Sequence, residues 1–272
     1  MSTIEIKNLY FHYTDSEPVL KDINLVLDGR TTAIIGQNGA GKTTLVKLLK
    51  GLLRPVKGEV LLDGEALAGF TVAQISRKIG LVFQNPNDQI FKNKVIDEVL
   101  FGPLNIGMEK KEAMERCRYS LELVGLGGIE EENPYDLGLS DRKLVAIASI
   151  LAMNTDVVVF DEPTIAQDYA AKEKIKAVIR RLREQGKMVL TIIHDMDFVA
   201  ECFERVIVLC GGKVLLDGPT ALVYAETNLL EQAYLEPPHV TQLCGSLGYN
   251  QVFLTVNAFV EHVKIQNRVL AK

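Results

Sequence analysis

The amino-acid sequence predicts an α/β fold with a mostly parallel core sheet. Strands and amphipathic helices alternate along most of the chain, which is the pattern of a parallel sheet covered by helices. The strands read as short apolar runs with many β-branched residues, as expected for strands that are buried on both faces. These runs cover residues 31–35, 79–83, 157–160, 188–193 and 206–210.

Outside these runs the sequence predicts a β subdomain, a helical subdomain, one further helix of the core and a C-terminal extension. Residues 4–8 and 23–27 alternate between apolar and polar, which favours a small N-terminal antiparallel β subdomain. The strand signal disappears over about 87–153, which predicts a helical subdomain inserted in the core, with helices at 109–124 and 140–153. A helix at 171–184 carries one apolar face and one basic face. After residue 218 we expect short helices, interrupted at Pro237-Pro238. The predicted domains are therefore 1–218 and a small helical extension, 219–272.

Composition excludes several classes of protein. The 272 residues are 47% apolar and 24% charged, which is ordinary for a globular chain and excludes a disordered chain or a disulfide scaffold. The net charge of −5 argues against a dedicated nucleic-acid-binding protein. Four cysteines without a CxxC pair predict free thiols in a reducing compartment. The sequence shows no secretory signal and no apolar run that could span a membrane, so we expect a cytoplasmic chain.

Residues 36–43, GQNGAGKT, fit the phosphate-loop pattern G-x-x-x-x-G-K-[ST] and lie between a predicted strand and a predicted helix at 44–50. Glycines allow backbone N–H groups to surround a phosphate, and the helix N-terminus adds partial positive charge. The lysine of the motif should reach the β- and γ-phosphates, and the following threonine should ligate Mg²⁺. The alternative is a glycine-rich turn that binds nothing, which the complete motif disfavours. The residues expected at the nucleotide are Gly36, Asn38, Gly39, Gly41, Lys42, Thr43 and Thr44.

An acidic pair follows the predicted strand 157–160. The strand delivers Asp161 to the sheet edge beside the phosphate loop, where its carboxylate can hold Mg²⁺ through water. Glu162 can turn toward the attacking water and act as a general base or water orienter. The alternative is an acidic pair that only caps the strand, and the phosphate loop weighs against it.

Four further residues indicate which family of phosphate-loop proteins the chain resembles. Residues 1–218 resemble the ATPase subunit of ABC transporters, because Tyr13, Gln84, Asp168 and His194 stand in the order of that family's A-loop, Q-loop, D-loop and switch positions. The resemblance implies that Tyr13 stacks on adenine and that Gln84 contacts Mg²⁺ and the lytic water. It also implies that His194 contacts the γ-phosphate. The implied cofactors are ATP and Mg²⁺, and the implied fold is the P-loop NTPase fold of ABC ATPases.

Three stretches resemble the ATPases of energy-coupling factor (ECF) importers, which take up vitamins and transition-metal ions. They are residues 80–91, 97–103 and 235–241. This resemblance implies an ATP-hydrolysing motor subunit at the cytoplasmic face of the membrane. Its partners would be a second ATPase subunit, a transmembrane coupling subunit and a substrate-binding membrane subunit, with no nucleic acid.

The family's signature LSGGQ is altered here to residues 137–141, LGLSD. In a head-to-tail dimer, the signature of one subunit covers the nucleotide of the other. Gly138 lacks the hydroxyl of the serine in LSGGQ. Leu139 adds a side chain where the backbone must approach the partner's nucleotide, and Asp141 adds negative charge near its phosphates. Ser140 would compensate in part if the loop shifted by two residues. A second departure, residues 165–167, lies beside the D-loop aspartate. We therefore expect a heterodimer with an intact partner signature rather than a homodimer.

Three alternatives remain at this point. A soluble ABC ATPase that acts outside transport would carry a long coiled-coil insert, or two cassettes with a basic linker. A non-catalytic regulatory subunit is suggested by the altered signature but opposed by the complete set of Lys42, Asp161, Glu162 and His194. A P-loop kinase is disfavoured by the Gln84 and His194 positions.

Overall fold

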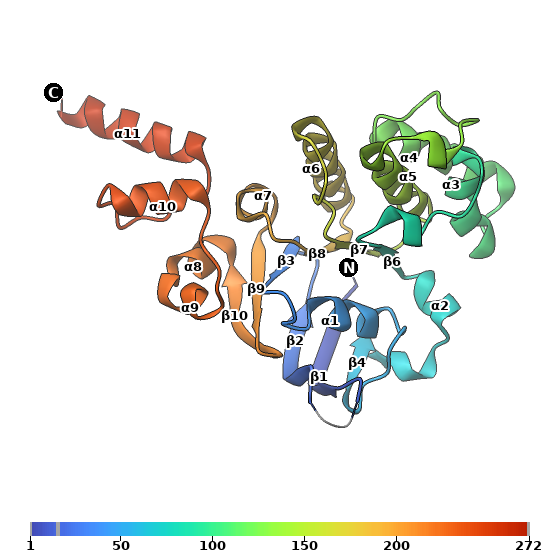
Figure 1. Cartoon of the computed structure of the whole chain (residues 1–272), viewed down its shortest axis with the longest axis horizontal. Coiled ribbons are helices and arrows are strands. Elements are labelled where there is room, and N and C mark those ends of the chain that lie inside the picture. The colour runs from blue at the N-terminus through green and yellow to red at the C-terminus, as the bar shows by residue number, and fades with distance from the viewer. Residues whose placement is uncertain (1, 15–16, 271–272) are drawn as a thin grey trace.

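The computed structural model describes residues 2–14 and 17–270, and a six-stranded sheet crosses its centre (Figure 1). Its strand order is β10-β9-β3-β8-β7-β6, in which β10 pairs with β9 in the antiparallel sense and the other five strands are parallel. The prediction of a mostly parallel core sheet is confirmed, and each of the five predicted strands differs from the observed one by a single terminal residue. The strands are β3 (Thr32–Ile35), β6 (Ile79–Val82), β7 (Val157–Asp161), β8 (Met188–Ile192), β9 (Arg205–Cys210) and β10 (Lys213–Pro219).

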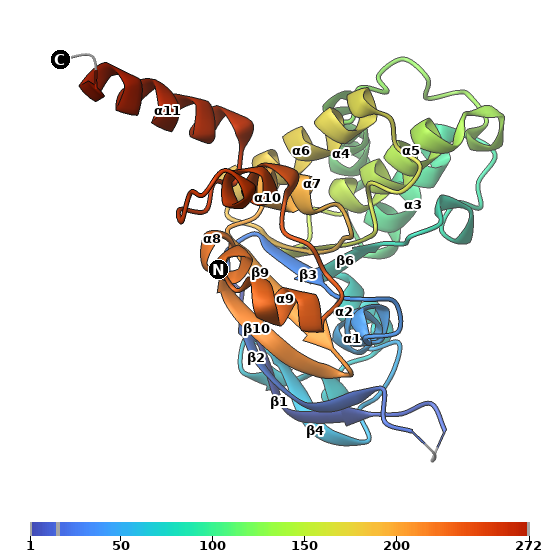
Figure 2. The ribbon, with the colours of Figure 1, turned by 60° about the vertical axis from the view of Figure 1, so that its left-hand side comes forward.

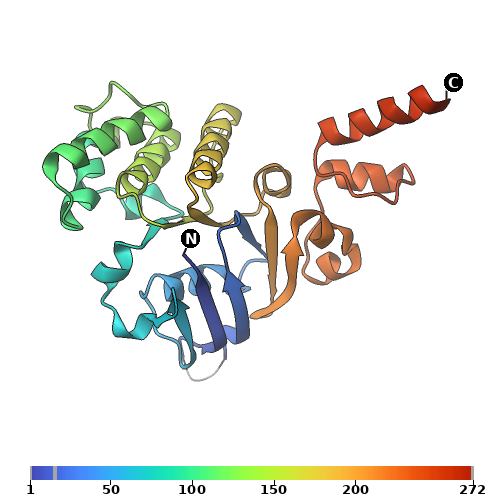
Figure 3. The same ribbon diagram turned by 180° about the vertical axis from the view of Figure 1, so that it is seen from behind.

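A second, antiparallel sheet forms the N-terminal β subdomain (Figure 3). Its order is β2-β1-β4-β5, and alternate residues of β1 and β2 are buried, which is why the sequence pattern revealed these two strands. The other two were not predicted, because β4 begins with three exposed residues and β5 is only two residues long. The strands are β1 (Ile4–Phe11), β2 (Leu20–Leu27), β4 (Lys57–Leu62) and β5 (Glu65–Ala66).

The predicted helical insert lies between β6 and β7 and consists mainly of α3 (Val95–Asn105), α4 (Lys110–Leu123) and α5 (Leu139–Ala152). Buried residues of α5 pack against α3 and α4, which explains why the helix is almost continuously apolar from Leu144 onward. The following helix, α6 (Tyr169–Glu184), begins two residues before the predicted start because the Asp168 carboxylate caps its first turn. The insert and α6 stand on the same side of the sheet (Figure 1).

The C-terminal residues form the expected short helices and one longer helix. Helix α11 (Val256–Leu270) has 15 residues and projects away from the body of the molecule (Figure 2). The expectation of short helices alone is wrong here: an apolar cluster of Val240, Cys244 and Phe253, with Tyr249 and Phe259 against it, joins the start of α11 to α10. The preceding helices are α7 (Met196–Cys202), α8 (Thr220–Ala225), α9 (Thr227–Gln232) and α10 (His239–Ser246).

Two layers of apolar side chains hold the central sheet between its neighbours. One layer fills the space toward the β subdomain and α1 (Lys42–Leu49), and the other lies under the helical insert and α6. Within the part of the chain that the structure describes, no helix is long and apolar enough to cross a membrane. The four cysteine thiols are free, as the sequence predicted.

Candidate functional site

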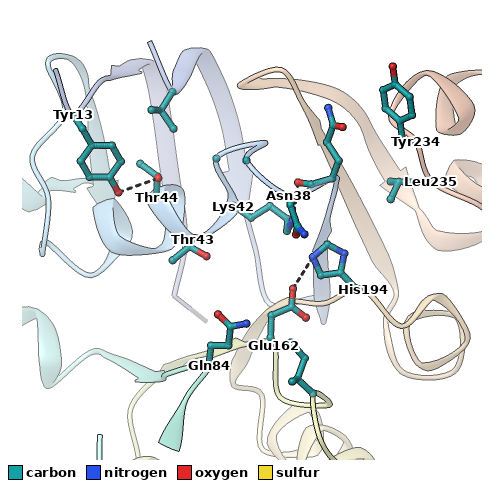
Figure 4. A pocket seen from close by; sticks show the side chains of 15 residues that line it. Tyr13, Asn38, Lys42, Thr43, Thr44, Gln84, Glu162, His194, Tyr234 and Leu235 are labelled. Carbon is teal, nitrogen blue, oxygen red and sulfur yellow. Dashed lines mark hydrogen bonds and ion pairs between the residues drawn. The ribbon is translucent and has the colours of Figure 1, made fainter. Parts of the chain in front are cut away.

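A cavity of about 680 Å³ opens at the carboxyl ends of the parallel strands (Figure 4). It collects side chains from the β subdomain, the phosphate loop, the loop after β6, the ends of β7 and β8, and the segment after α9. Ten residues predicted from the sequence line it: Tyr13, Asn38, Gly39, Gly41, Lys42, Thr43, Thr44, Gln84, Glu162 and His194. The other lining residues are Val19, Gln37, Ile165, Tyr234 and Leu235.

The phosphate loop runs from β3 into α1, whose first residue is Lys42 rather than the predicted residue 44. Gly41 caps the helix at φ 99°, and a Cβ there would lie 2.6 Å from the Leu20 side chain. A Cβ on Gly36 would lie 2.3 Å from the Leu209 carbonyl oxygen. Glycine is therefore required at both positions, because a side chain would displace the loop from its supporting strands.

The Lys42 ammonium is folded back onto its own loop. Its Nζ donates to the carbonyl oxygens of Gly36, at 2.7 Å, and Gln37, at 3.0 Å. Burial lowers the pKa of Lys42, while the carboxylates of Glu162 and Asp161 act in the opposite direction. The loop therefore places a buried cation close enough to Glu162 and Asp161 for their charges to interact.

Asp161 is the last residue of β7, Glu162 follows it directly, and both are almost fully buried. Glu162 has a left-handed backbone conformation, φ 50°, which is strained for a residue with a side chain and is typical of functional sites. Burial raises the pKa of both carboxyls, and that of Glu162 rises to about 7. Asp161 Oδ1 and Glu162 Oε2 are buried oxygens without a hydrogen-bond partner. Such oxygens fit a divalent cation and a water molecule, with the Thr43 hydroxyl nearby in the cavity wall.

The His194 ring faces Glu162 across the cavity floor. The distance between Nε2 of His194 and Oε1 of Glu162 is 3.0 Å, and the glutamate side chain is the more buried of the two. Burial lowers the pKa of His194, and the nearby Lys42 charge lowers it further. A neutral imidazole can then donate its Nε2–H to the carboxylate and hold it in place.

Lys143 is a residue that the sequence analysis missed. It lies in α5, is 1% exposed, and donates through Nζ to the carbonyl oxygens of Phe83, at 2.9 Å, and Gln84. Burial lowers the pKa of Lys143 to about 8, and its charge favours the ionised form of Asp161. In the sequence Lys143 directly precedes the apolar run 144–153, and a charged residue beside such a run was the signal that would have identified it.

Two tyrosines lie on opposite sides of the phosphate loop (Figure 4). The Tyr13 hydroxyl lies 3.2 Å from Thr44 Oγ1, and its ring packs edge-on against Phe11 while remaining 57% exposed. Tyr234, which the sequence analysis did not identify, has φ 56° and lies next to buried Leu235. The C-terminal residues therefore form part of the cavity wall.

The remaining predicted residues do not line this cavity. Gly36, at the start of the phosphate loop, and Asp161 are both buried and do not appear in the cavity lining. Asp168 caps α6 through a 2.8 Å bond from the Ala171 amide. The altered signature lies at the start of α5, with Gly138 as its N-cap residue and the next three in the first turn: Leu139, Ser140 and Asp141.

Comparisons with known proteins agree with this geometry. A family model described as "ABC transporter" matches residues 20–165. An energy-coupling factor transporter ATP-binding protein of Methanocaldococcus jannaschii is 40% identical over 251 residues, which are 91% of this chain and 90% of that protein.

Two solved structures have similar folds. The cbiO1 subunit of Clostridium perfringens, described as part of the ABC transporter complex cbiONQ, has a TM-score of 0.76 at 30% identity. The match covers 89% of this chain and 98% of that one. The ATP-binding cassette MJ0796, a dimer bound to ADP and Pi, has a TM-score of 0.72 at 28% identity, covering 80% of this chain and 98% of the other.

Proposed function

The chain belongs to the ABC transporter ATPase family, and we propose that it is the ATP-hydrolysing motor subunit of an ECF importer for a vitamin or a transition-metal ion. In this proposal it works as a head-to-tail dimer with a different ATPase subunit. The observation that supports the hydrolytic role best is the convergence of Lys42, Glu162 and His194 on one cavity, with buried carboxylate oxygens that have no partner in the protein.

The cavity residues and the buried Asp161 suggest a division of roles. Thr43, Gln84 and Asp161 would hold Mg²⁺, which would neutralise charge on the phosphates of ATP. Lys42 would exchange its bonds to the Gly36 and Gln37 carbonyls for bonds to phosphate oxygens. The exposed ring of Tyr13 offers an aromatic face for the adenine.

Glu162 is suited to accept a proton from the attacking water. Its pKa of about 7 makes it a stronger base than an ordinary glutamate while leaving it ionised in a large fraction of molecules at neutral pH. His194 would hold Oε1 of this carboxylate, so that Oε2 is free to face the water.

The altered signature supports a heterodimer. Gly138 offers no hydroxyl to a partner-bound γ-phosphate, and the loss of a hydrogen bond to a charged group is worth about 1.5–3 kcal/mol. Leu139 is 47% exposed where a glycine backbone would approach the nucleotide. A homodimer would carry this defect at both sites, whereas an intact partner signature would leave one site competent.

An exposed aromatic pair supports the membrane partner. The rings of Phe91 and Phe101 meet edge-on, with centroids 4.7 Å apart, and both side chains are substantially exposed. The Lys92 ammonium lies about 5 Å from each ring centroid. This patch lies on the helical insert and the loop that follows Gln84, so a transmembrane coupling subunit docked there would sense movement of that loop. We propose peripheral attachment to the cytoplasmic face of the membrane through such a subunit.

Tagged co-purification from solubilised membranes tests the proposed assembly. The expected co-eluting proteins are a second ATPase subunit, a transmembrane coupling subunit and a substrate-binding membrane subunit. Replacing Phe91 and Phe101 with alanine should release the membrane proteins, whereas Leu222→Ala, at an exposed apolar residue of α8, should not. Co-elution of soluble proteins alone would overturn the assignment.

A further inference from the structure

The two segments that depart from the ABC family pattern touch each other. Ser140 comes from the altered signature and Gln167 from the altered D-loop segment, 27 residues further along the chain. The Ser140 hydroxyl donates to Gln167 Oε1 at a distance of 2.8 Å. Two departures from the family pattern that look independent in the sequence are therefore joined by one hydrogen bond.

Gln167 is held in position by its own turn. Ala166 has a left-handed conformation, φ 58°, and the Gln167 amide N–H donates to the Thr164 carbonyl oxygen at 3.2 Å. The side-chain Nε2 donates to the Ile165 carbonyl oxygen at 3.4 Å. These contacts turn the remaining polar atom, Oε1, toward Ser140.

Ser140 carries the one hydroxyl of the signature segment 137–141. It lies in the first turn of α5 and is half-buried, and the N-cap residue Gly138 provides no side-chain oxygen. Any hydroxyl that this segment could offer to a phosphate must therefore come from Ser140.

We propose that Gln167 is a positioning residue that retains the Ser140 hydroxyl within its own subunit and withholds it from the nucleotide of the partner subunit. This inference rests on the proposed head-to-tail dimer. On closure, Ser140 would have to break its bond to Gln167 before it could donate to a phosphate. One hydrogen bond replaces another, so the hydroxyl adds little to the affinity of closure.

Removing the acceptor should reveal the contribution of Ser140. A hydrogen bond of this kind is worth about 0.5–1.5 kcal/mol, which corresponds to roughly a two- to tenfold change in an equilibrium constant. Gln167→Met keeps the length of the side chain but has no strong acceptor. We expect it to strengthen ATP-dependent dimer closure two- to tenfold, provided that Ser140 is present.

The test is a double-mutant cycle in the purified full chain carrying Glu162→Gln, which keeps bound ATP intact. Self-association is measured by sedimentation velocity in ATP and Mg²⁺ for the parent, Gln167→Met, Ser140→Ala and the double variant. Gln167→Met should strengthen association two- to tenfold, and it should have no effect in the Ser140→Ala chain. A gain of equal size in both backgrounds would overturn the proposal, as would a Gln167→Met chain that does not associate more tightly than the parent.

Three controls separate the possible failures. Gln185→Met, at the exposed C-cap residue that follows α6, should leave association unchanged. The unfolding midpoint of each variant should match that of the parent, which shows that folding is intact. Binding of a fluorescent ATP analogue should also be unchanged. If ATP binding is unchanged but association does not respond to Gln167→Met, the role given to Gln167 is refuted and the proposed function stands. A chain that binds no ATP would refute the proposed function itself.

Discussion

Nε2 of His194 lies 3.0 Å from Oε1 of Glu162, at the ends of the neighbouring parallel strands β8 and β7. The pairing of these strands brings together residues that are 32 positions apart in the sequence. It leaves Oε2 of Glu162 buried and without a partner. The arrangement combines an oriented carboxylate with an acceptor atom that has no partner in the protein, which is what a general base for water requires.

Glu162→Gln should stop ATP hydrolysis while leaving ATP binding intact. The amide keeps the size of the side chain and an oxygen that can accept from His194, but it cannot take a proton. We expect phosphate release to fall about 100-fold or more, in the range of lost general-base catalysis. Phosphate release at saturating ATP and binding of a fluorescent ATP analogue measure the two effects. Glu184→Gln, at the exposed end of α6, serves as the control; hydrolysis at the parental rate would contradict the role given to Glu162.

The rate should depend on pH through the same carboxyl. Burial raises the pKa of Glu162 to about 7, and only the ionised form can accept a proton. Because kcat/KM reports the free enzyme, it should rise about tenfold per pH unit below 7 and level off above it. Initial rates between pH 5.5 and 8.5 measure this profile, provided that the fold is stable throughout. A profile that is flat down to pH 5.5 would argue against Glu162 as the base.

Lys42→Ala should weaken the binding of ATP. The ammonium would lose its contact with phosphate oxygens, and a hydrogen bond to a charged group is worth about 1.5–3 kcal/mol. We therefore expect the Kd to rise about ten- to a hundredfold in equilibrium binding experiments. Lys111→Ala, at an exposed residue of α4, is the matched control. Equal affinities for the two variants would mean that Lys42 does not reach the nucleotide.

Lys143→Met should reduce both stability and turnover. The substitution removes the donor to the Phe83 and Gln84 carbonyl oxygens, which are partly buried in the folded chain. We expect the free energy of unfolding to fall by about 1–3 kcal/mol, measured by urea denaturation. Turnover should fall as well, because the backbone of Gln84 loses its anchor to α5. Lys110→Met, at the exposed start of α4, should change neither quantity. If Lys143→Met has the same stability and turnover as Lys110→Met, the bond from Lys143 to the Gln84 backbone is unimportant.

Gly138→Ser should raise the ATPase rate of the isolated chain. The backbone at Gly138, φ −61° and ψ 159°, is open to any residue, and a Cβ there would contact nothing within 4 Å. The new hydroxyl should restore a bond to the nucleotide of a second copy and increase the rate about tenfold. Gly245→Ser, at an equally open glycine of α10, controls for the added side chain. A rate that does not change would indicate that Leu139 or Asp141, rather than the missing hydroxyl, limits the homodimer.

The sequence by itself determined the parallel sheet and the phosphate loop. Buried parallel strands must be apolar on both faces, so their residues form continuous runs that stand out from the rest of the chain. The phosphate loop is equally local, because Gly36 and Gly41 have positive φ, a backbone conformation that favours glycine. Nine of the ten predicted residues that line the cavity follow strands of the parallel sheet, whose carboxyl ends lie at the same edge, and the tenth, Tyr13, comes from the β subdomain.

Contacts between distant segments were decided by the tertiary structure alone. Strand β4 depends on pairing with β1, and the short edge strand β5 depends on pairing with β4, rather than on their own polar sequences. The bond from Lys143 to the Gln84 carbonyl spans 59 residues, and the bond from Ser140 to Gln167 spans 27. A single hydrogen bond leaves no periodic pattern in the sequence, because each partner is an ordinary polar residue until folding removes water from around both.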